Sequence, residues 1–477
     1  MSALWAAADL VKATGGVASG EWCGWRMEID SRKVQAGDIY VAIRGARFDG
    51  HDFVEDAFSR GAIAAMVERK LDITGNQLVV ADCYKALDAI AKYNRARSNA
   101  RIIGVTGSVG KTTTKEMLRL ALTGHGKIYA TTGNYNNHIG TPLNLANLPL
   151  DTEFAVFEMG MNHAGEIAHL TKMVRPHIAL ISCVEAVHLE YFSSVEEIAK
   201  AKAEIFEGLE GFTTHNNITT PHPNPPPQGG RENSEGGIAI INADQKYFSD
   251  VPNKITFGIS ENADCKLLDY KPAVDGSLVS AEIYGEKIDY KIAAMGRHVA
   301  VISLSVLAVV KALGLDIEKS ARELAKFAEV EGRGRVEKIK FTGTEILLVN
   351  DSYNASPASM CAAFEKTNEV WQAHGGKGRK VAMLGDMLEL GEAAATLHSG
   401  LAENLIKQGF DKVYTAGSLM KNLHDALPEK MRGGHAEKAE GLLGIIQLHV
   451  GDVVLIKGSH GSKIYEVANA LLKNGGK

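Results

Sequence analysis

The feature that most constrains the fold is the stretch from Arg101 to Leu122, which reads RIIGVTG, then SVG, then KTTTKEMLRLAL. The first run has the apolar composition of a buried strand, and the last has the residue types of a helix. Gly107 and Gly110 allow the tight turns of the loop between them. A strand that enters a helix through a glycine loop is a building unit of parallel sheets, so this part of the chain is expected to be α/β.

The loop between this strand and helix has the composition of a phosphate-binding site. Its backbone N–H groups, with about half a positive charge at the helix N-terminus, favour an anion. Lys111 can reach the terminal phosphates of a nucleotide, and the hydroxyl of Thr112 or Thr113 can hold Mg²⁺. The strict GxxxxGK[ST] spacing fails, because Val105 stands where its first glycine belongs. The strand–loop–helix context still predicts binding of ATP or GTP.

The length of 477 residues predicts about three domains. Residues 1–97 contain the strand-like runs DIYVAI and AIAAMV and the helix-like KALDAIAKYNRAR. In residues 98–325, apolar strand-like runs alternate with helical stretches, which predicts a mainly parallel sheet covered on both faces. Residues 326–477 repeat this pattern and are expected to form a second, Rossmann-like α/β domain.

The strand-like runs of the third segment end in polar residues or glycine. These residues are Asp351, Asp386, Gly417 and Lys457. In open α/β sheets, ligands bind at the carboxyl ends of the strands. The sequence therefore predicts that ligands bind at one edge of this domain's sheet, where these strands end; we call it the working edge.

Charge and composition limit the classes of partner and the cellular environment that we expect for this chain. A formal net charge of −5 gives no reason to expect nucleic acid or an anionic membrane surface. Five scattered cysteines without a CxxC pattern suit free thiols in a reducing cytoplasm. The N-terminal MSALWAAADLVKATGG is expected to be a short helix that ends at a glycine, not a signal peptide. The most apolar run, Val299 to Val310, is shorter than the ~18 residues that span a bilayer, so we expect a buried helix and no membrane insertion.

One stretch interrupts the α/β pattern. Thr214 to Gly237 contains the proline-rich run PHPNPPP, which cannot continue a helix or a central strand. It lies between a helical stretch and a strand-like run that a short turn could join. We interpret it as a surface insertion in the central domain.

The remaining motifs carry a resemblance to a known family. They are TTGNYNNHIGTP, FEMGMNHAGEI, VHLEYFSSVEEIAKAKAEI, NDSYNASPASM, MLGDMLELG and KGSHGSK. Together they resemble the Mur ligases of bacterial cell-wall synthesis, over essentially the whole chain apart from the proline-rich stretch. DSYNASP, LGDMLELG and DSRKVQAGDIYVAIRGARFDGHDF are the most specific parts. They resemble the family member that acts last in the pathway.

The resemblance implies an ATP-dependent amide ligase that joins D-alanyl-D-alanine to UDP-N-acetylmuramoyl-tripeptide. ATP would phosphorylate the substrate carboxylate, and the amine would attack the acyl phosphate, releasing ADP and phosphate. This would be the last cytoplasmic step in making the peptidoglycan nucleotide precursor. The resemblance also implies a monomer, and domain closure over the substrates.

The resemblance also assigns metal ligands and catalytic groups. Glu158, His188 and Thr112 are expected to hold Mg²⁺. Lys202 matches a carbamylated lysine that would hold a second Mg²⁺, with Lys200 as the alternative if the register differs. The expected catalytic residues are Lys111, Glu158, His188, Lys202 and Arg333.

The remaining assignments concern ATP and the substrate. The expected ATP-binding residues are Gly107, Ser108, Val109, Gly110, Lys111, Thr112, Thr113, Asn137, His298, Arg333, Asp351, Tyr353 and Asn354. Arg335 is the near alternative to Arg333. The expected substrate-binding residues are Ser31, Arg32, Asp49, Gly50, His51, Asn136, Lys457 and Lys463.

Four positions depart from the family pattern. Cys183, Val299 and Ile302 stand where asparagine is common, and His460 stands where arginine is common. Cys183, Val299 and Ile302 keep open an inactive scaffold with the ligase fold. A sister ligase that adds glutamate to folate is a second hypothesis, which DSYNASP and LGDMLELG disfavour. A P-loop switch or motor is a third, which the off-spacing of the phosphate loop disfavours.

Overall fold

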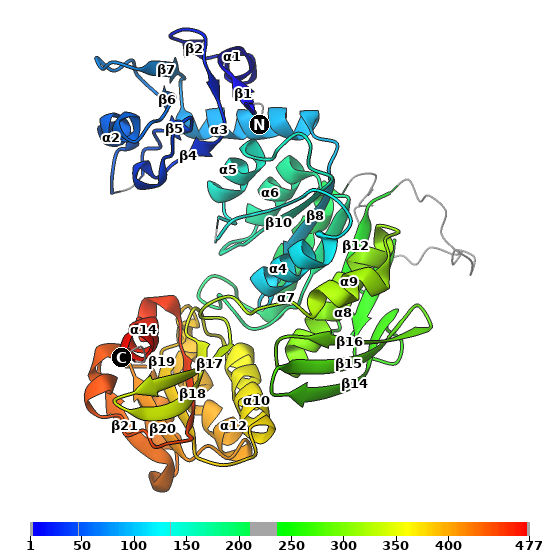
Figure 1. The fold of residues 1–477 in the computed structure, drawn as a ribbon, viewed down its shortest axis with the longest axis vertical. Helices are drawn as coiled ribbons and strands as arrows, with labels where there is room; N and C mark the ends of the chain where they lie inside the picture. Colours follow the sequence, from blue (N-terminus) through cyan, green and yellow to red (C-terminus); the bar gives the residue numbers. More distant parts are fainter. Residues whose placement is uncertain (1–2, 46, 134, 210–235, 475–477) are drawn as a thin grey trace. The chain divides into compact units, whose positions relative to one another are not determined.

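The computed structural model describes residues 3–45, 47–133, 135–209 and 236–474 (Figure 1). The chain divides into two compact units, each assembled from separate segments. The first unit comprises Met1–Thr106, His125–Leu180 and Ala203–Ile238, and the second comprises Gly107–Gly124, Ile181–Lys202 and Ala239–Lys477. The domain boundaries at residues 97 and 325 stay predictions. The proline-rich stretch at 214–237 lies, except for its last two residues, outside the described residues.

The N-terminal part of the first unit is built on a small sheet. Its strand order is β2 (Val17–Ala18), β7 (Asn76–Val79), β6 (Ala64–Val67), β5 (Ile39–Val41) and β4 (Met27–Glu28). The β2–β7 pair is antiparallel, and the other neighbours are parallel. A separate antiparallel pair joins β1 (Trp5–Ala6) to β3 (Cys23–Gly24).

Helices cover both faces of this sheet, because strand side chains alternate between them. Ile39 and Val41 lie in a buried cluster with residues of α1 (Ala7–Thr14) and α3 (Cys83–Arg97). Tyr40 lies in the opposite cluster with residues of α2 (Val54–Ser59). The expected N-terminal helix is confirmed as α1, which ends at Gly15 with φ of 69°.

The other strands of the first unit follow the order β11 (Ile178–Ile181), β8 (Arg101–Thr106), β10 (Phe154–Glu158) and β9 (Ile128–Ala130). β10 is parallel to both β8 and β9, as the apolar runs predict. The helical elements α5 (Gly140–Ala146), α6 (Glu166–Val174) and η3 (Glu204–Gly208) belong to the same unit. The sheet places the carboxyl end of β10, Glu158, beside Val105 near the end of β8.

The second unit begins at Gly107 with the phosphate loop, and α4 (Lys111–Leu122) follows this loop. It packs with α8 (Arg297–Ala312) and α9 (Ile317–Leu324). The expected buried helix at Val299–Val310 is confirmed as the core of α8. α7 (Val195–Ala203) carries Lys202.

The strands of this region depart from the expected helix–strand alternation. β12 (Ile238–Asn242), β13 (Lys254–Gly258) and β14 (Cys265–Ala273) pair in parallel, but β15 (Gly276–Ile283) and β16 (Glu286–Ile292) continue as an antiparallel meander. The turn between β15 and β16 consists of Tyr284 and Gly285, with φ of 52° and 83°. Two consecutive left-handed residues make the tight turn that joins antiparallel strands. This hairpin was not predicted from the sequence, because an X-Gly turn is a weaker signal than an apolar run.

The C-terminal part of the second unit is a six-stranded sheet. Its order is β17 (Arg335–Phe341), β18 (Thr344–Asp351), β22 (Val453–Lys457), β19 (Lys380–Gly385), β20 (Lys412–Ala416) and β21 (Arg432–Ala436). All neighbours are parallel except β17 and β18. The predicted strands and the Rossmann-like pattern are therefore confirmed.

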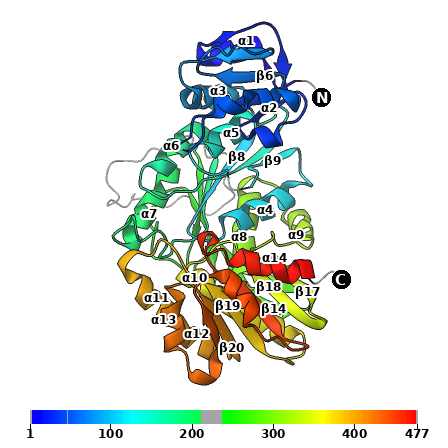
Figure 2. The ribbon, with the colours of Figure 1, turned by 90° about the vertical axis from the view of Figure 1, so that its left-hand side faces the viewer.

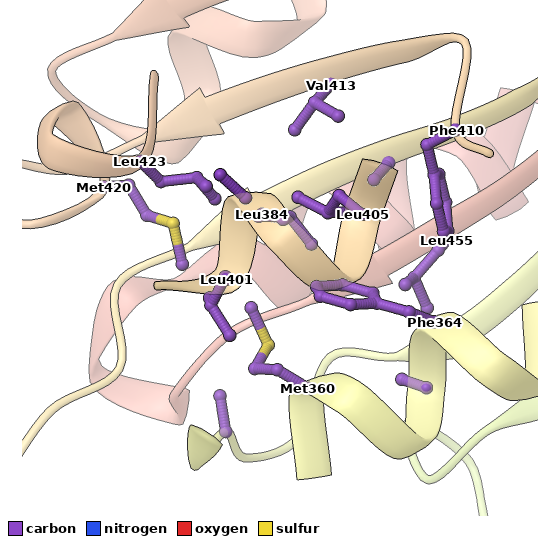
Figure 3. Close-up of a cluster of buried hydrophobic side chains, with 14 of the residues drawn as sticks. Met360, Phe364, Leu384, Leu401, Leu405, Phe410, Val413, Met420, Leu423 and Leu455 are labelled. Carbon is purple, nitrogen blue, oxygen red and sulfur yellow. The ribbon is translucent and has the colours of Figure 1, made fainter. Parts of the chain in front are cut away.

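Alternation along β19 again decides the two faces of the sheet. Ala382 and Leu384 face a core with α10 (Pro357–Ala373), α11 (Ala394–Ser399), α12 (Leu401–Lys407) and α13 (Met420–Ala426). Val381 and Met383 face the opposite core, which includes residues of α14 (Ile464–Asn474). Figure 2 shows α14 beside this sheet. Figure 3 shows side chains of α10, α12 and the sheet meeting in the first core.

Two sequence expectations about the environment can be compared with the structure. All five cysteines are free thiols, and Cys83 and Cys265 are buried. Among the described residues, no helix has both the length and the apolar character needed to cross a membrane.

Candidate active site

The phosphate loop accepts only glycine at its two glycine positions. Gly107 has φ of 150°, and a Cβ there would lie 1.9 Å from Oγ of Ser182. Gly110 has φ of 84°, and its Cβ would lie 2.9 Å from Cδ1 of Ile302. Ile302, one of the departures from the family pattern, therefore packs against the loop.

The segment after β11 forms hydrogen bonds with the phosphate loop. Oγ of Ser182 donates to the carbonyl of Val109 at 2.5 Å, and Ser108 N–H donates to the carbonyl of Cys183 at 2.9 Å. Glu185 N–H donates to Oγ of Ser108 at 2.9 Å. Ser182 and Glu185 were not predicted, because nothing in their local sequence indicates a contact with residues more than 70 positions earlier.

Cys183 takes part in the same support. Its Sγ lies 3.4 Å from both the backbone nitrogen and the carbonyl oxygen of Val109. Burial raises the pKa of this thiol. The thiol thus touches the loop where the family often has asparagine, but a thiol is a weaker hydrogen-bonding group.

Lys111 folds back on the loop. Its Nζ donates to the carbonyl oxygens of Gly107, at 2.7 Å, and Ser108, at 3.4 Å. Thr112 is buried and Thr113 is half-buried in the first turn of α4. The lysine and both hydroxyls thus stand at the start of a helix, where an anion is favoured.

Lys202 is a buried amine close to this loop. Its residue is only 2% exposed, whereas the neighbouring Lys200 is exposed. Burial, and then the charge of Lys111, lower the pKa of Lys202 to about 7, although the Cys183 thiol acts in the opposite direction. A large part of the Lys202 side chains therefore carries a neutral, nucleophilic amine near pH 7.

Glu158 occupies the carboxyl end of β10 in the first unit and is 2% exposed. Nδ2 of Asn136 donates to its Oε1 at 2.9 Å. Asn137 has a different role, because its Oδ1 accepts from the backbone of Ile139, at 3.1 Å, and Gly140, at 2.9 Å. The structure thus brings Asn136 to Glu158 and uses the Asn137 side chain to shape the turn before α5.

His188 pairs with Glu389, for which the sequence predicted no role. Its Nδ1 lies 2.5 Å from Oε2 of Glu389, in the motif LGDMLELG. This hydrogen bond lowers the pKa of the Glu389 carboxyl. The motif was noted in the sequence, but spacing along the chain could not place it beside His188.

The predicted working edge of the C-terminal sheet gathers several expected residues. Asp351 and Lys457 are register partners on β18 and β22, and Nζ of Lys457 donates to Oδ2 of Asp351 at 2.6 Å. Nζ also donates to the carbonyl of Asn354 at 2.9 Å. The guanidinium of Arg333 lies 4.2 Å from the ring centroid of Tyr353.

The other expected residues of the second unit are less connected. His298 is exposed in the first turn of α8, and the next residue, Val299, is buried. Lys463 is exposed and has φ of 59°. His460 stacks on Tyr465 with ring centroids 4.7 Å apart and an interplanar angle of 10°.

In the N-terminal region, His51 has a structural role. Its ring is buried, Nε2 accepts from Glu68 N–H at 2.9 Å, and Nδ1 lies 2.6 Å from Oδ1 of Asp49. Because Nε2 accepts, Nδ1 carries the proton, and this N–H donates a hydrogen bond to Oδ1 of Asp49. The His51 backbone hydrogen bond is the main cause that lowers the pKa of Asp49 to about 2.

The other residues expected there differ in exposure. Ser31 and Gly50 are buried, and a Cβ on Gly50 would lie 2.6 Å from the carbonyl of Ile43. Arg32 has an 80% exposed side chain and pairs with Asp30 at 2.8 Å. Arg32 is therefore the expected residue there with the most freedom to meet a ligand.

In the parts of the chain that the structure describes, no three His, Cys, Asp or Glu side chains gather as a metal site. The expected donors are instead one carboxylate, one imidazole and one hydroxyl. Mg²⁺ is commonly held by one or two protein groups, with waters and substrate phosphates completing its shell. The carboxylate and the hydroxyl are hard oxygen donors of the kind this ion prefers, so the residues present fit Mg²⁺.

Three family models match successive parts of the chain. The Mur ligase family catalytic domain matches residues 26–106, the Mur ligase middle domain matches 105–220, and the Mur ligase glutamate ligase domain matches 334–460. The UDP-N-acetylmuramoyl-tripeptide–D-alanyl-D-alanine ligase of Rickettsia prowazekii is 35% identical over 93% of this chain and 94% of its own length. The ligase of the same name from Bacillus subtilis is 33% identical over 93% of this chain and 92% of its own length.

The chain belongs to the Mur ligase family.

Solved structures agree with this membership. A crystal structure of MurF from Acinetobacter baumannii matches this Mur ligase with a TM-score of 0.80 and 27% identity, over 98% of this chain and 99% of the other. MurF from Thermotoga maritima, solved in complex with ADP, matches with a TM-score of 0.73 and 29% identity, over 94% and 97%. The fold is therefore the three-domain α/β fold of the Mur ligases, as the sequence predicts.

Proposed function

We propose that this Mur ligase joins D-alanyl-D-alanine to UDP-N-acetylmuramoyl-tripeptide, with hydrolysis of ATP to ADP and phosphate. Relatives that carry this activity in their names match more than nine-tenths of the chain. The phosphate loop and the strand-end Glu158 are the parts that an ATP-dependent ligase needs. The reaction would take place in the cytoplasm, where the nucleotide precursor of peptidoglycan is made, and the enzyme would act as a monomer.

The chemistry explains why a phosphate loop serves a ligase. A carboxylate is a poor electrophile, because its leaving group would be oxide. Phosphorylation by ATP converts that oxygen into a phosphate leaving group, and the amine of D-alanyl-D-alanine then displaces phosphate to form the amide. The protein has to position the reactants and neutralise anionic oxygens. Lys111 and the N–H groups of the loop at Gly107–Gly110 would do so on the ATP side.

The observation that carries the proposal is the buried Lys202 near Lys111. A buried ammonium close to a second cation is costly, and the low pKa keeps much of the amine neutral near pH 7. A neutral amine can add to CO₂, with loss of one proton, to form a carbamate. The carbamate is an anion that would offset the charge of Lys111 and offer oxygen ligands. A P-loop switch or motor has no use for such a group.

Glu158, His188, Thr112 and carbamylated Lys202 would hold one or two Mg²⁺ ions. Mg²⁺ supplies charge neutralisation for phosphate oxygens in phosphoryl transfer. Asn136 keeps the Glu158 carboxylate oriented through its hydrogen bond.

Other residues would bind ATP or the UDP-linked substrate. On the ATP side, Ser108, Val109, Gly110 and Thr113 would contribute with Asn137, His298, Arg333, Asp351, Tyr353 and Asn354. On the substrate side, Ser31, Arg32, Asp49 and Gly50 would contribute with Asn136, Lys457 and Lys463, and His51 would hold Asp49 in place. Lys457 is paired with Asp351, so we propose that it keeps this carboxylate oriented toward the ribose.

The test is phosphate release from ATP and Mg²⁺ in the presence of UDP-N-acetylmuramoyl-tripeptide, with and without D-alanyl-D-alanine. Release that requires both substrates, with a product heavier by one dipeptide, is expected. Release without either substrate would favour a nucleotidase or switch. Bound ATP with no release at all would favour an inactive scaffold and point to Cys183, Val299 and Ile302.

A second test addresses the carbamate. Lys202→Ala should lose activity by about 10²-fold or more, as does the loss of one electrostatic stabiliser in other enzymes. Lys200→Ala, its exposed neighbour, should keep activity. Wild-type activity should fall in CO₂-free buffer and return with bicarbonate, and an unchanged rate in CO₂-free buffer would contradict carbamylation.

A further inference from the structure

The motif LGDMLELG, which begins at the end of β19 and continues into the loop after it, supplies a carboxylate to the expected metal ligand His188. Oε2 of Glu389 lies 2.5 Å from Nδ1 of His188, although the two residues are 201 positions apart. An ionised carboxylate can only accept a hydrogen bond, so Nδ1 of a neutral imidazole carries the proton. Nε2 is then the nitrogen with a free lone pair for a metal.

The backbone around both residues is held in an uncommon conformation. His188 has φ of 55° and Glu389 has φ of 62°, in the left-handed region that side chains other than glycine rarely adopt. Conformations of this kind are energetically unfavourable and concentrate at functional sites. Two such residues in contact indicate that the surrounding structure requires this arrangement.

Backbone contacts lock the two loops together. Glu190 N–H donates to the carbonyl of Glu389 at 3.2 Å and joins the two loops, and Tyr191 N–H donates to the carbonyl of His188 at 2.9 Å within the first loop. Gly391 has φ of 56°, and a Cβ there would lie 3.3 Å from the carbonyl of Leu189. The position of the carboxylate is therefore set by backbone as well as by side chain.

Stability alone does not explain the pair. The side chains of His188 and Glu389 are 22% and 41% exposed. Pairs exposed to this degree contribute little to stability, which does not offset the cost of two left-handed residues. Orientation of the imidazole is a better explanation, because metal-bound histidines almost always donate their second N–H to a carboxylate or a carbonyl.

We propose that Glu389 is a positioning residue that fixes the tautomer and ring orientation of His188 for Mg²⁺. This proposal rests on the metal-binding role of His188 in the proposed function. In this role Glu389 would contact His188 and not the metal or the substrate. Glu389 follows β19 of the C-terminal sheet. The orientation of His188 as a metal ligand would therefore depend on the position of the loop that carries Glu389.

The test measures metal affinity directly in the full-length protein. Mn²⁺ replaces Mg²⁺ as a probe, and its dissociation constant is measured by electron paramagnetic resonance in the presence of ADP. We expect Glu389→Ala to weaken Mn²⁺ binding about 10–100-fold. Glu389→Gln, whose amide oxygen can accept the same hydrogen bond, should recover much of this loss. Glu392→Ala removes a nearby exposed carboxylate and should leave the affinity unchanged.

A double-mutant comparison tests whether Glu389 affects Mn²⁺ affinity through the orientation of His188 or through a general change in the protein. His188→Ala should weaken Mn²⁺ binding, and His188→Ala with Glu389→Ala should weaken it no further, because Glu389 acts only through His188. Wild-type Mn²⁺ affinity in Glu389→Ala, with or without a lower melting temperature, would overturn the proposal. So would additive losses in the double variant. If His188→Ala itself keeps wild-type affinity, the metal role of His188 in the proposed function fails as well.

Discussion

At the scale of single residues, the phosphate loop has no room for a side chain at Gly107. Gly107 lies so close to Ser182 that an added Cβ would overlap its Oγ at 1.9 Å. Gly107→Ala is therefore expected to displace the loop and to weaken ATP binding by about tenfold or more. A tenfold change corresponds to a loss of ~1.4 kcal/mol of binding free energy. Binding of a fluorescent ATP analogue would measure the change.

Two variants control this prediction. Ser182→Ala combined with Gly107→Ala removes the overlapping oxygen and should recover part of the affinity. Gly444→Ala adds a Cβ with nothing within 4 Å and should bind ATP like the wild type. Equal affinity in wild type and Gly107→Ala would show that the loop can move away from Ser182.

Lys202 makes a pH-dependent contribution to stability. Its pKa falls from 10.5 in the unfolded chain to about 7 in the folded protein. Between these values the unfolded state binds more protons, so stability rises with pH, by up to ~1.4 kcal/mol per pH unit. The cost of the buried charge is fully present below pH 7.

We therefore compare Lys202→Met with wild type in CO₂-free buffer. The variant should be the more stable of the two at pH 6.5, and its advantage should shrink by about 2 kcal/mol between pH 7.5 and 9. Melting temperatures at several pH values would show this. Parallel pH profiles for the two proteins would mean that Lys202 keeps an ordinary pKa.

At the scale of elements, the helices on one face of the C-terminal sheet share a buried core with it. Phe364 of α10 is fully buried and meets Phe410 edge-on, with ring centroids 5.6 Å apart (Figure 3). Phe364→Ala should lower the free energy of unfolding by about 3–5 kcal/mol, through lost burial and the cavity left behind.

Ile406→Ala on α12 is the matched control, because Ile406 is 49% exposed. Its cost should stay within about 0.5 kcal/mol. Denaturant unfolding followed by circular dichroism would compare the two variants. A loss below about 1 kcal/mol for Phe364→Ala would indicate that the core around α10 collapses to fill the cavity.

At the scale of the whole molecule, a buried ion pair fixes the segment that joins α9 to β17. Lys366 of α10 pairs with Glu329 of this segment, and their side chains are 2% and 9% exposed. Burial raises the pKa of Glu329 to about 7, although the charge of Lys366 opposes this shift. The pair holds the segment that carries Arg333 against α10.

Removing either partner should have unequal effects. Glu329→Gln leaves a buried ammonium without its carboxylate and should cost about 3–5 kcal/mol. Lys366→Met should cost less, because the Glu329 carboxyl, already near its pKa at neutral pH, can take up a proton. Melting temperatures of the two variants and of the double variant would test this order, and equal losses would contradict it.

The sequence by itself determined the α/β class, most of the strands and helices, and the phosphate loop. These features depend on local periodicity and on residue types at short spacing, which any stretch of the chain carries with it. The family motifs identified the Mur ligase family for the same reason. The X-Gly hairpin at Tyr284–Gly285 was missed because its local signal is weak.

Only the tertiary structure decided which side chain meets which. It showed that His51 holds Asp49, that the Asn137 side chain shapes a turn, and that Ile302 packs on the phosphate loop. It also brought Glu389 to His188 across 201 positions. Such contacts depend on how strands and helices pack, and a sequence pattern contains no distance between residues that are far apart along the chain.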